Sequence, residues 1–323
     1  MIPFDPLFRN PHIQTIAAHF WPRDGAERRF PVSARLYRTE PDVQVLVHSQ
    51  WPRAPAGGIV IVHGLEGSGE AGYVRGLCAA VLRAGFGAHR FHMRTCGGTE
   101  HLCPTLYHAG LTGDLASVVR QLCLEGSAPL YLVGFSLGGN VVLKLAGELE
   151  SEARDLICAV CAVSPPLDLA ACVRRMGERE NRIYERRFAR NMRKRLAATR
   201  RYNRAELAAL RSVFEIDDRI TAPAFGFGNA ETYYRTQSAA GYLNRIRVPT
   251  LIVHAKDDPL VPLESCQSAL ACGNPCINSW VTAHGGHLGF LGRKPHRFWL
   301  EEAILEWVVC QNANQRAPRI VKQ

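Results

Sequence analysis

A serine flanked by glycines constrains the fold of this 323-residue chain more than any other feature. It lies in Gly-Phe-Ser-Leu-Gly at 134–138, between the apolar run 129–133 and a stretch of helical periodicity at 138–149. This order predicts a buried strand, a sharp turn and a helix. Side chains at the two glycine positions would collide with neighbouring backbone, so the glycines let the turn lift the Ser136 hydroxyl clear of the sheet. Ser136 is the first candidate nucleophile; an ordinary glycine- and serine-rich turn is the alternative for so short a motif.

The rest of the chain alternates apolar runs with stretches of helical periodicity. The apolar runs predict strands at 35–37, 43–47, 58–62, 87–92, 130–134, 157–164, 250–254 and 279–282. Apolar residues three or four apart predict helices at 73–84, 110–125, 138–149, 263–271 and 296–311. This alternation predicts an α/β fold with a mostly parallel central sheet covered by helices on both faces. The first two strands have no helix between them, so we expect them to be antiparallel.

An inserted segment interrupts this alternation. The pattern stops after Pro166 and resumes at Val248, which divides the chain into a first core part at 1–166, a helical, arginine-rich cap at 167–247, and a second core part at 248–323. The apolar residues of the cap recur at helical spacing and include Val173, Met176, Ile183, Tyr184, Phe188, Met192 and Leu196. We expect this apolar stripe to pack on the core rather than to bind a cofactor.

The net charge of +10 is concentrated in the cap. Between Arg174 and Arg211 there are fourteen basic residues and four acidic ones, so the rest of the chain is formally neutral. The simplest interpretation is a solvated helix face whose arginines pair with nearby acids. Attraction to anionic lipid or substrate is the second interpretation, because basic helices with an apolar stripe favour negatively charged surfaces, and nucleic acid is the least favoured.

Cysteine usage and the N-terminus bear on the cellular compartment. Eleven scattered cysteines, an odd number, indicate reduced thiols. Cys158 and Cys161 form a C-x-x-C pair inside an apolar strand pattern, which argues against a redox or zinc site. Prolines and charges break up the first nine residues before an apolar segment can grow, and no other segment has membrane-crossing length without charge. We expect a cytoplasmic protein, with peripheral contact at the inner membrane face left open.

A serine nucleophile requires a histidine to take its proton and an acid to orient that histidine. In a strand-turn-helix arrangement of this kind, the acid and then the histidine follow later strands. Asp257 and Asp258 follow the strand at 250–254. We favour Asp258, because it stands four residues before Pro262 in a D-x-x-V-P pattern, and keep Asp257 as the alternative.

Two histidines follow the last predicted strand. His284 and His287 enclose a pair of glycines at 285–286. We favour His287 as the base, since the preceding glycines let the loop turn its imidazole toward the sheet edge. His284 is then expected to be structural.

A developing oxyanion requires preorganised backbone donors. We expect one from the N–H of Leu137, after the nucleophile, and one from the N–H of Leu65, in the glycine-rich loop 63–69. That loop also resembles a phosphate loop, but it lacks both G-K-[ST] and the dinucleotide spacing.

Metal-dependent hydrolysis is the competing chemistry. His89 and His92, or His284 and His287, could be ligand pairs. The first pair lies in a strand, where its members would face opposite ways, and no H-E-x-x-H motif is found. We expect neither a metal nor a cofactor.

The combined motifs resemble one family nearly from end to end. They are N-P-H-I-Q-T at 10–15, H-G-L-E-G-S at 63–68, the serine motif extended to 134–140, 255–259, and H-G-G-H-L-G-F at 284–290. Together they resemble the YheT-like branch of the α/β-hydrolases, related to eukaryotic abhydrolase-domain lipases and yeast medium-chain alcohol acyltransferases. One departure is Arg-Thr-Cys-Gly-Gly at 94–98, where the family pattern has Arg-Gly before the cysteine.

The resemblance implies an α/β-hydrolase fold and a triad of Ser136, Asp258 and His287. It implies a carboxylesterase or lipase that cleaves acyl esters through an acyl-enzyme, with short- to medium-chain esters or monoacylglycerol-like lipids as substrates. Acyl transfer to an alcohol through the same intermediate is an alternative, and an anionic-lipid-binding protein acting through the basic cap is an alternative of another class.

Overall fold

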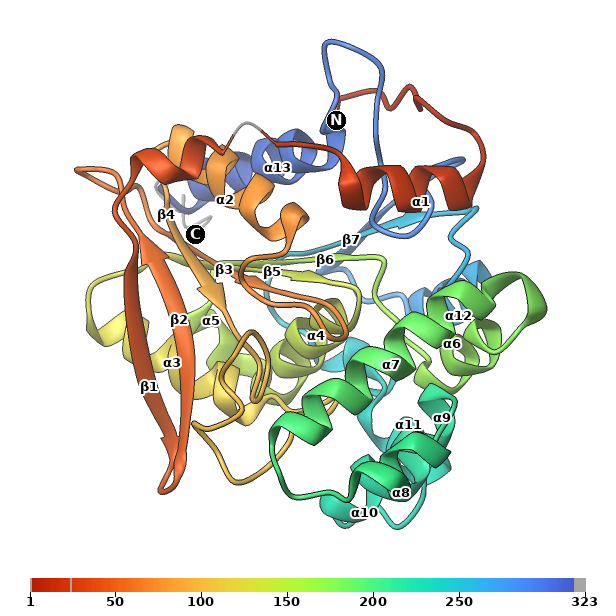
Figure 1. Cartoon of the computed structure of the whole chain (residues 1–323). Coiled ribbons are helices and arrows are strands. Elements are labelled where there is room, and N and C mark those ends of the chain that lie inside the picture. The colour runs from red at the N-terminus through yellow and green to blue at the C-terminus, as the bar shows by residue number, and fades with distance from the viewer. Residues whose placement is uncertain (1, 24, 317–323) are drawn as a thin grey trace.

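A single eight-stranded sheet organises the computed structural model, which describes residues 2–23 and 25–316. The strand order is β1-β2-β4-β3-β5-β6-β7-β8 (Figure 1). The first two strands form an antiparallel hairpin and most of the other neighbours are parallel, as the sequence predicted. The antiparallel pairing of β2 with β4 was not predicted. The strands are β1 (Ser33–Glu40), β2 (Val43–Gln50), β3 (Gly58–Val62), β4 (Gly87–Phe91), β5 (Leu130–Phe135), β6 (Ala159–Val163), β7 (Thr250–Ala255) and β8 (Ile277–Thr282).

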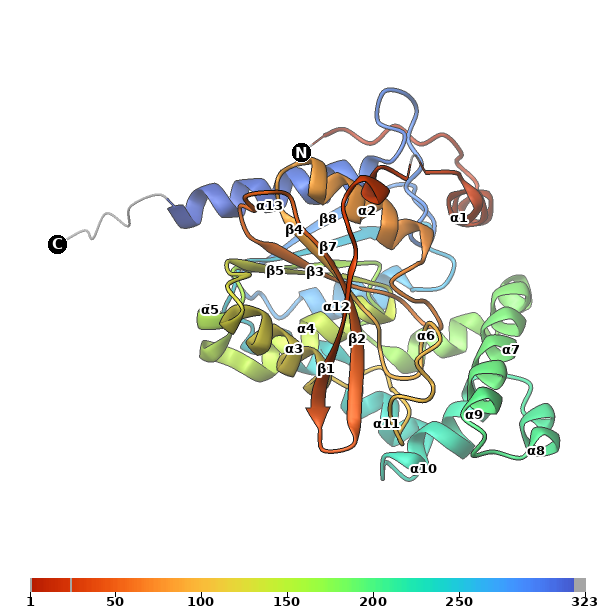
Figure 2. The same cartoon turned by 60° about the vertical axis from the view of Figure 1, so that its left-hand side comes forward.

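Helices cover both faces of this sheet (Figure 2). One layer contains α2 (Gly72–Arg83) and α13 (Trp299–Arg316), and the other contains α3 (Gly113–Leu124), α4 (Leu137–Leu149) and α12 (Leu263–Leu270), with the short α5 (Ala153–Leu156) beside them. In β3, Ile59 and Ile61 pack into the first layer, whereas Val60 and Val62 pack into the second. Successive strand residues face opposite sides, so a continuous apolar run becomes a strand that is buried on both faces.

The segment between β6 and β7 is helical. It contains α6 (Leu169–Met176), α7 (Arg182–Ala198), α8 (Arg204–Ala209), α9 (Val213–Ile216), α10 (Ala222–Ala224) and α11 (Ala230–Gln237). Its outer helices α7 and α8 stand away from the sheet (Figure 2). They contribute to a hydrophobic cluster that includes Met192, Leu196 and Ile216. The expectation for the apolar stripe is wrong at Ile183, which is 71% exposed because it lies on the outer side of α7.

Helix α1 (Pro11–Phe20) was not predicted from the sequence. Its start has a local cause: the Asn10 side chain accepts hydrogen bonds from the amides of His12 and Ile13, and Pro11 occupies the first helical position. Only Gln14 and Ala18 of this helix are buried, so it lacks the broad apolar face on which helix prediction depends. In the described part of the chain, no helix combines the length and the apolar composition needed to cross a membrane.

Candidate active site

Ser136 occupies a strained turn between β5 and α4. Its backbone has φ 51° and ψ −121°, a conformation that residues other than glycine rarely adopt. Its amide donates a hydrogen bond to the Val163 carbonyl at 2.8 Å. A Cβ at Gly134 would lie 2.2 Å from the Gly138 oxygen, and a Cβ at Gly138 would lie 2.5 Å from the Val62 oxygen. Both glycines are therefore required by close backbone approach, as the motif indicated.

Three of the predicted residues lie in one hydrogen-bonded line. The Ser136 Oγ is 2.9 Å from His287 Nε2, and His287 Nδ1 is 2.9 Å from Asp258 Oδ2. The amides of Leu260 and Val261 donate to Asp258 Oδ1 at 2.9 and 3.0 Å. These two donors fix the carboxylate, so its other oxygen points at the imidazole.

The charge state of Asp258 suits this arrangement. Burial by itself would raise the pKa of the carboxyl, but the neighbouring imidazole of His287 and the backbone hydrogen bonds outweigh it, and the pKa lies below its usual range. An ionised carboxylate accepts a hydrogen bond from an N–H at Nδ1 of His287, which leaves Nε2 as an acceptor facing the serine hydroxyl.

The alternative acid and histidine form a separate pair. Asp257 Oδ1 accepts from the Gly286 amide at 2.9 Å, and Asp257 Oδ2 lies 3.2 Å from His284 Nδ1. Asp257 is thus bonded to the loop that precedes His287, while Asp258 is bonded to the His287 ring itself.

Helix α1 holds the same loop from the other side. The Thr15 hydroxyl accepts from the His287 amide at 2.8 Å and donates to the Pro11 carbonyl at 2.7 Å. Gly286 has φ 58°, and a Cβ there would lie 2.5 Å from the Pro11 oxygen. Gln14 Nε2 donates to the Leu291 carbonyl at 2.9 Å. Sequence reasoning noted both terminal motifs but missed this contact, which positions His287.

The loop after β3 lies against the serine. A Cβ at Gly64 would be 3.1 Å from the Ser136 Cβ. The amides on either side of Leu65 already donate hydrogen bonds to side chains. The Gly64 amide donates to the Tyr73 hydroxyl at 2.9 Å, and the Glu66 amide donates to the Tyr107 hydroxyl at 3.0 Å. Leu137 begins α4, where the first amides have no intrahelical acceptor. Leu65 and Leu137 thus carry backbone donors on two segments that border Ser136 and its cavity.

A buried ion pair joins the inserted segment to this loop. Arg195 Nε lies 2.9 Å from Glu66 Oε1, with side chains only 8% and 4% exposed. The Tyr107 hydroxyl donates to the same Glu66 oxygen at 2.9 Å, and the Arg195 guanidinium stacks 4.7 Å from the Tyr107 ring centre. Arg195 is therefore a packed residue rather than one of a solvated basic face.

The departure at 94–98 is connected to the same arginine. Thr95 has φ 59°, in the left-handed region that glycine adopts without strain, and its hydroxyl accepts from Arg195 Nη1 at 2.9 Å. The Thr95 side chain, which a glycine at this position would lack, thus supplies a further contact to the inserted segment.

Two cavities meet at Ser136 and His287. The inner one, of about 720 Å³, lies under the inserted helices and has a mainly apolar lining that includes Leu169, Val173, Met176, Phe188, Met192 and Val213. The outer one, of about 970 Å³, is bordered by α1 and α7, and its lining includes Ile16, His19, Phe20, Arg23, Arg187 and Asn191. Part of the apolar stripe of the cap therefore lines a cavity instead of packing on the core.

Comparisons with known proteins agree with this architecture. The family model described as alpha/beta hydrolase fold matches residues 58–294. The chain is 36% identical to the putative esterase YheT of Escherichia coli over 93% of its own length and 91% of that protein. It is 30% identical to a monoacylglycerol lipase of Saccharomyces cerevisiae over 77% of its own length, but spans only 58% of that relative.

Solved structures show the same fold at lower identity. The esterase Pf2001 of Pyrococcus furiosus superposes with a TM-score of 0.60 at 18% identity, covering 90% of this chain and 94% of that one. Est1E from Butyrivibrio proteoclasticus gives 0.56 at 16% identity, covering 87% and 99%. The chain therefore belongs to the α/β-hydrolase family, in the branch that contains YheT and the abhydrolase-domain lipases.

Proposed function

We propose that this protein is a carboxylic-ester hydrolase with Ser136 as nucleophile, His287 as general base and acid, and Asp258 as the residue that orients His287. The observation that carries the proposal is the hydrogen-bonded line from Ser136 through His287 to Asp258, with 2.9 Å at each step, built on a strained turn. Membership of the carboxylesterase and lipase type of hydrolase supports it.

The proposed reaction has two halves. The Ser136 Oγ attacks the ester carbonyl while its proton passes to His287 Nε2, and the amides of Leu65 and Leu137 hold the negative charge on the carbonyl oxygen. The tetrahedral intermediate collapses, the C–O bond to the alcohol breaks, and the alcohol leaves with the proton from His287. Water then gives its proton to Nε2 and attacks the acyl-enzyme, which releases the free acid and the Ser136 hydroxyl.

The inner cavity favours an acyl chain as its occupant, because its lining is mainly apolar and it opens at Ser136. We propose residues 167–247 as the lid that supplies much of this lining. Short- to medium-chain esters or monoacylglycerol-like lipids are the proposed substrates, in keeping with the yeast relative named a monoacylglycerol lipase.

The test is hydrolysis of p-nitrophenyl butyrate by the parent and by Ser136→Ala. We expect the variant to lose nearly all activity and to lose labelling by a fluorophosphonate probe. Ser151→Ala, at an exposed position outside the site, is the matched control and should behave like the parent. Parent-level turnover by Ser136→Ala would remove the proposal.

A specific surface also favours contact with anionic membranes. Ile13, Ile16 and Phe20 of α1 and Ile183 of α7 are between 42% and 71% exposed. The two helices touch where the His12 ring stacks on Tyr184, 5.8 Å between ring centres, and both border the outer cavity. Exposed arginines of α7 flank these apolar side chains, namely Arg182, Arg186, Arg187 and Arg190. Apolar side chains beside basic ones suit the interface of an anionic bilayer.

We propose that this protein is cytoplasmic, that it docks through this surface on the inner membrane face, and that it takes lipid esters into the outer cavity. Co-sedimentation with vesicles containing phosphatidylglycerol should decrease as salt increases and should decrease further in Phe20→Ser. Binding that is indifferent to vesicle charge would exclude this role for the basic cap.

A further inference from the structure

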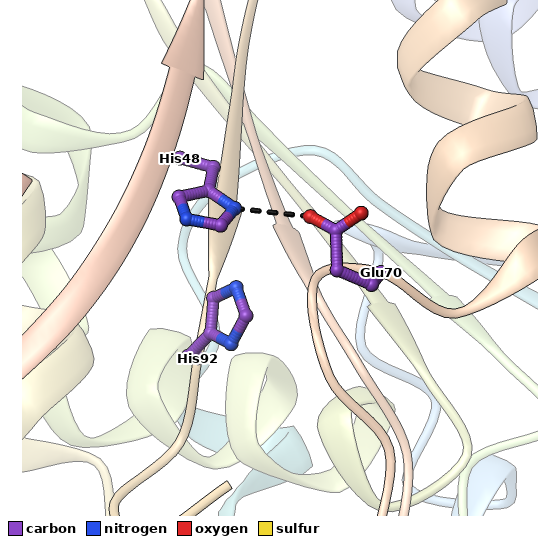
Figure 3. Close-up of side chains that lie close together, drawn as sticks. All are labelled: His48, Glu70 and His92. Atoms are coloured by element: carbon purple, nitrogen blue, oxygen red, sulfur yellow. Dashed lines mark hydrogen bonds and ion pairs between the residues drawn. The ribbon is translucent and has the colours of Figure 1, made fainter. Parts of the chain in front are cut away.

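We propose that His48, Glu70 and His92 form a binding site for a divalent transition-metal ion of the zinc type. Each residue offers one ligand atom, and these atoms lie within 4.8 Å of one another (Figure 3). None of the three belongs to the proposed catalytic machinery. Glu70 lies on the loop between β3 and α2, and the same loop carries Leu65.

The register of the sheet brings the two histidines together. His48 on β2 stands directly opposite Arg90 on β4, so the two side chains share one face of the sheet. His92, two residues beyond Arg90, points to the same face. His89 instead pairs with Ser49 and accepts or donates a hydrogen bond there at 2.9 Å. His89 and His92 thus face opposite sides of the sheet, as the sequence predicted. His92 instead shares its face with His48 on the neighbouring strand β2.

His92 is buried and, within the described part of the chain, its ring nitrogens are unpaired, as expected for a metal ligand in the absence of its metal. Its side chain is buried, with 1% exposed, and neither ring nitrogen has a hydrogen-bond partner among the described residues. Buried polar atoms are normally paired, and a neutral imidazole is the form that binds metals.

The other two ligands already have suitable spacing. His48 Nδ1 lies 3.0 Å from Glu70 Oε1. Two ligands on a tetrahedral zinc ion, with bonds of about 2.0–2.1 Å, are about 3.3 Å apart. An ion would therefore replace the proton that these two atoms share. Since His92 lies at most 4.8 Å from the other ligand atoms, it would need to approach them by up to about 1.5 Å.

Arg90 is the charged group that faces this cluster. Its Nη1 donates to Glu70 Oε1 at 2.5 Å and to the Gly69 carbonyl at 2.8 Å, which fixes both the carboxylate and the loop. Hydrogen bonds of this kind orient metal-binding carboxylates. The guanidinium also repels a cation, so we expect weaker binding than in a structural zinc site with thiolate ligands.

The donor set selects the class of ion. Two imidazole nitrogens and one carboxylate oxygen suit Zn²⁺, Co²⁺, Ni²⁺ or Cu²⁺, whereas Mg²⁺ and Ca²⁺ prefer oxygen ligands. The Glu70 side chain is 52% exposed and that of His48 is 20% exposed, which gives an ion access from solvent. A bound ion would connect β2, β4 and the loop of Leu65.

The test uses chelator-treated full-length protein titrated with Zn²⁺ against a chromophoric indicator, and with Co²⁺ followed by its visible absorption. We expect one ion per chain. His48→Gln and Glu70→Gln should each weaken binding by at least about tenfold, whereas His101→Gln, at an exposed histidine outside the cluster, should bind like the parent. His92 is buried, so the two more exposed positions carry the test.

Zn²⁺ should also raise the melting temperature of the parent and of His101→Gln, but not that of His48→Gln. Equal binding by all variants would place the ion elsewhere, for example on the free thiols, and would overturn the proposal, as would the absence of binding. Ser136→Ala should bind the ion like the parent, so this result is independent of the proposed hydrolase activity.

Discussion

The buried ion pair between Arg195 and Glu66 offers the sharpest test of how the proposed cap supports the proposed active site. Replacing Arg195 by Met removes the guanidinium but keeps an apolar stem of similar length. Among the described residues, Glu66, only 4% exposed, would then retain just the Tyr107 hydroxyl as a side-chain partner, apart from any water that enters. Removing one member of a buried ion pair costs about 3–5 kcal/mol, because the other charge is left buried without compensation.

Arg195→Met should therefore lower the free energy of unfolding in urea by about 3 kcal/mol or more. It should also lower kcat for p-nitrophenyl butyrate, because Glu66 adjoins Leu65. Loss of one oxyanion donor costs about 10²–10³ in kcat, which sets the upper limit for a displaced loop.

A double-mutant cycle separates charge from packing. The double variant Arg195→Met with Glu66→Gln removes both charges, so we expect it to recover much of the lost stability. Arg190→Met, at an exposed arginine of α7, is the matched control and should change the unfolding free energy by less than about 0.5 kcal/mol. If Arg195→Met were as mild as this control, the ion pair would not hold the cap to the loop.

Four further results are expected. Asp258→Asn should lower kcat by about 10⁴-fold, whereas Asp257→Asn should have a much smaller effect; equal losses in steady-state kinetics would contradict the assignment. Thr15→Val should lower kcat with little change in KM, and Thr15→Ser should restore it, because only the hydroxyl accepts from the His287 amide. The depressed pKa of Asp258 stabilises the fold above the unfolded-state value of 3.8, and this stability is lost as pH falls through the lower folded pKa, so urea titrations should show the advantage of the parent over Asp258→Asn shrinking there. With an acyl donor and added glycerol, free acid should be the sole product; a glyceride would instead favour acyl transfer.

The sequence was sufficient for the fold because the relevant signals are local. The apolar run of β3 and the glycines around Ser136 each specify a strand or a turn within a few residues, and these elements lie where they were predicted. Helix α1 was missed because it packs mainly through Gln14, Ala18 and Thr15, which give no apolar periodicity.

The positions that sequence could not predict depend on contacts between distant segments. Thr15 and His287 are separated by 272 residues, yet the threonine hydroxyl meets the histidine amide because Gly286 leaves room for the Pro11 carbonyl. The same holds for His48 and His92, which become neighbours only through the register of β2 against β4. A one-residue slip in that pairing would turn His48 to the opposite face, where Ser49 now meets His89. Register thus decides which histidines can act together, and a single sequence shows their spacing along the chain but not their spacing across the sheet.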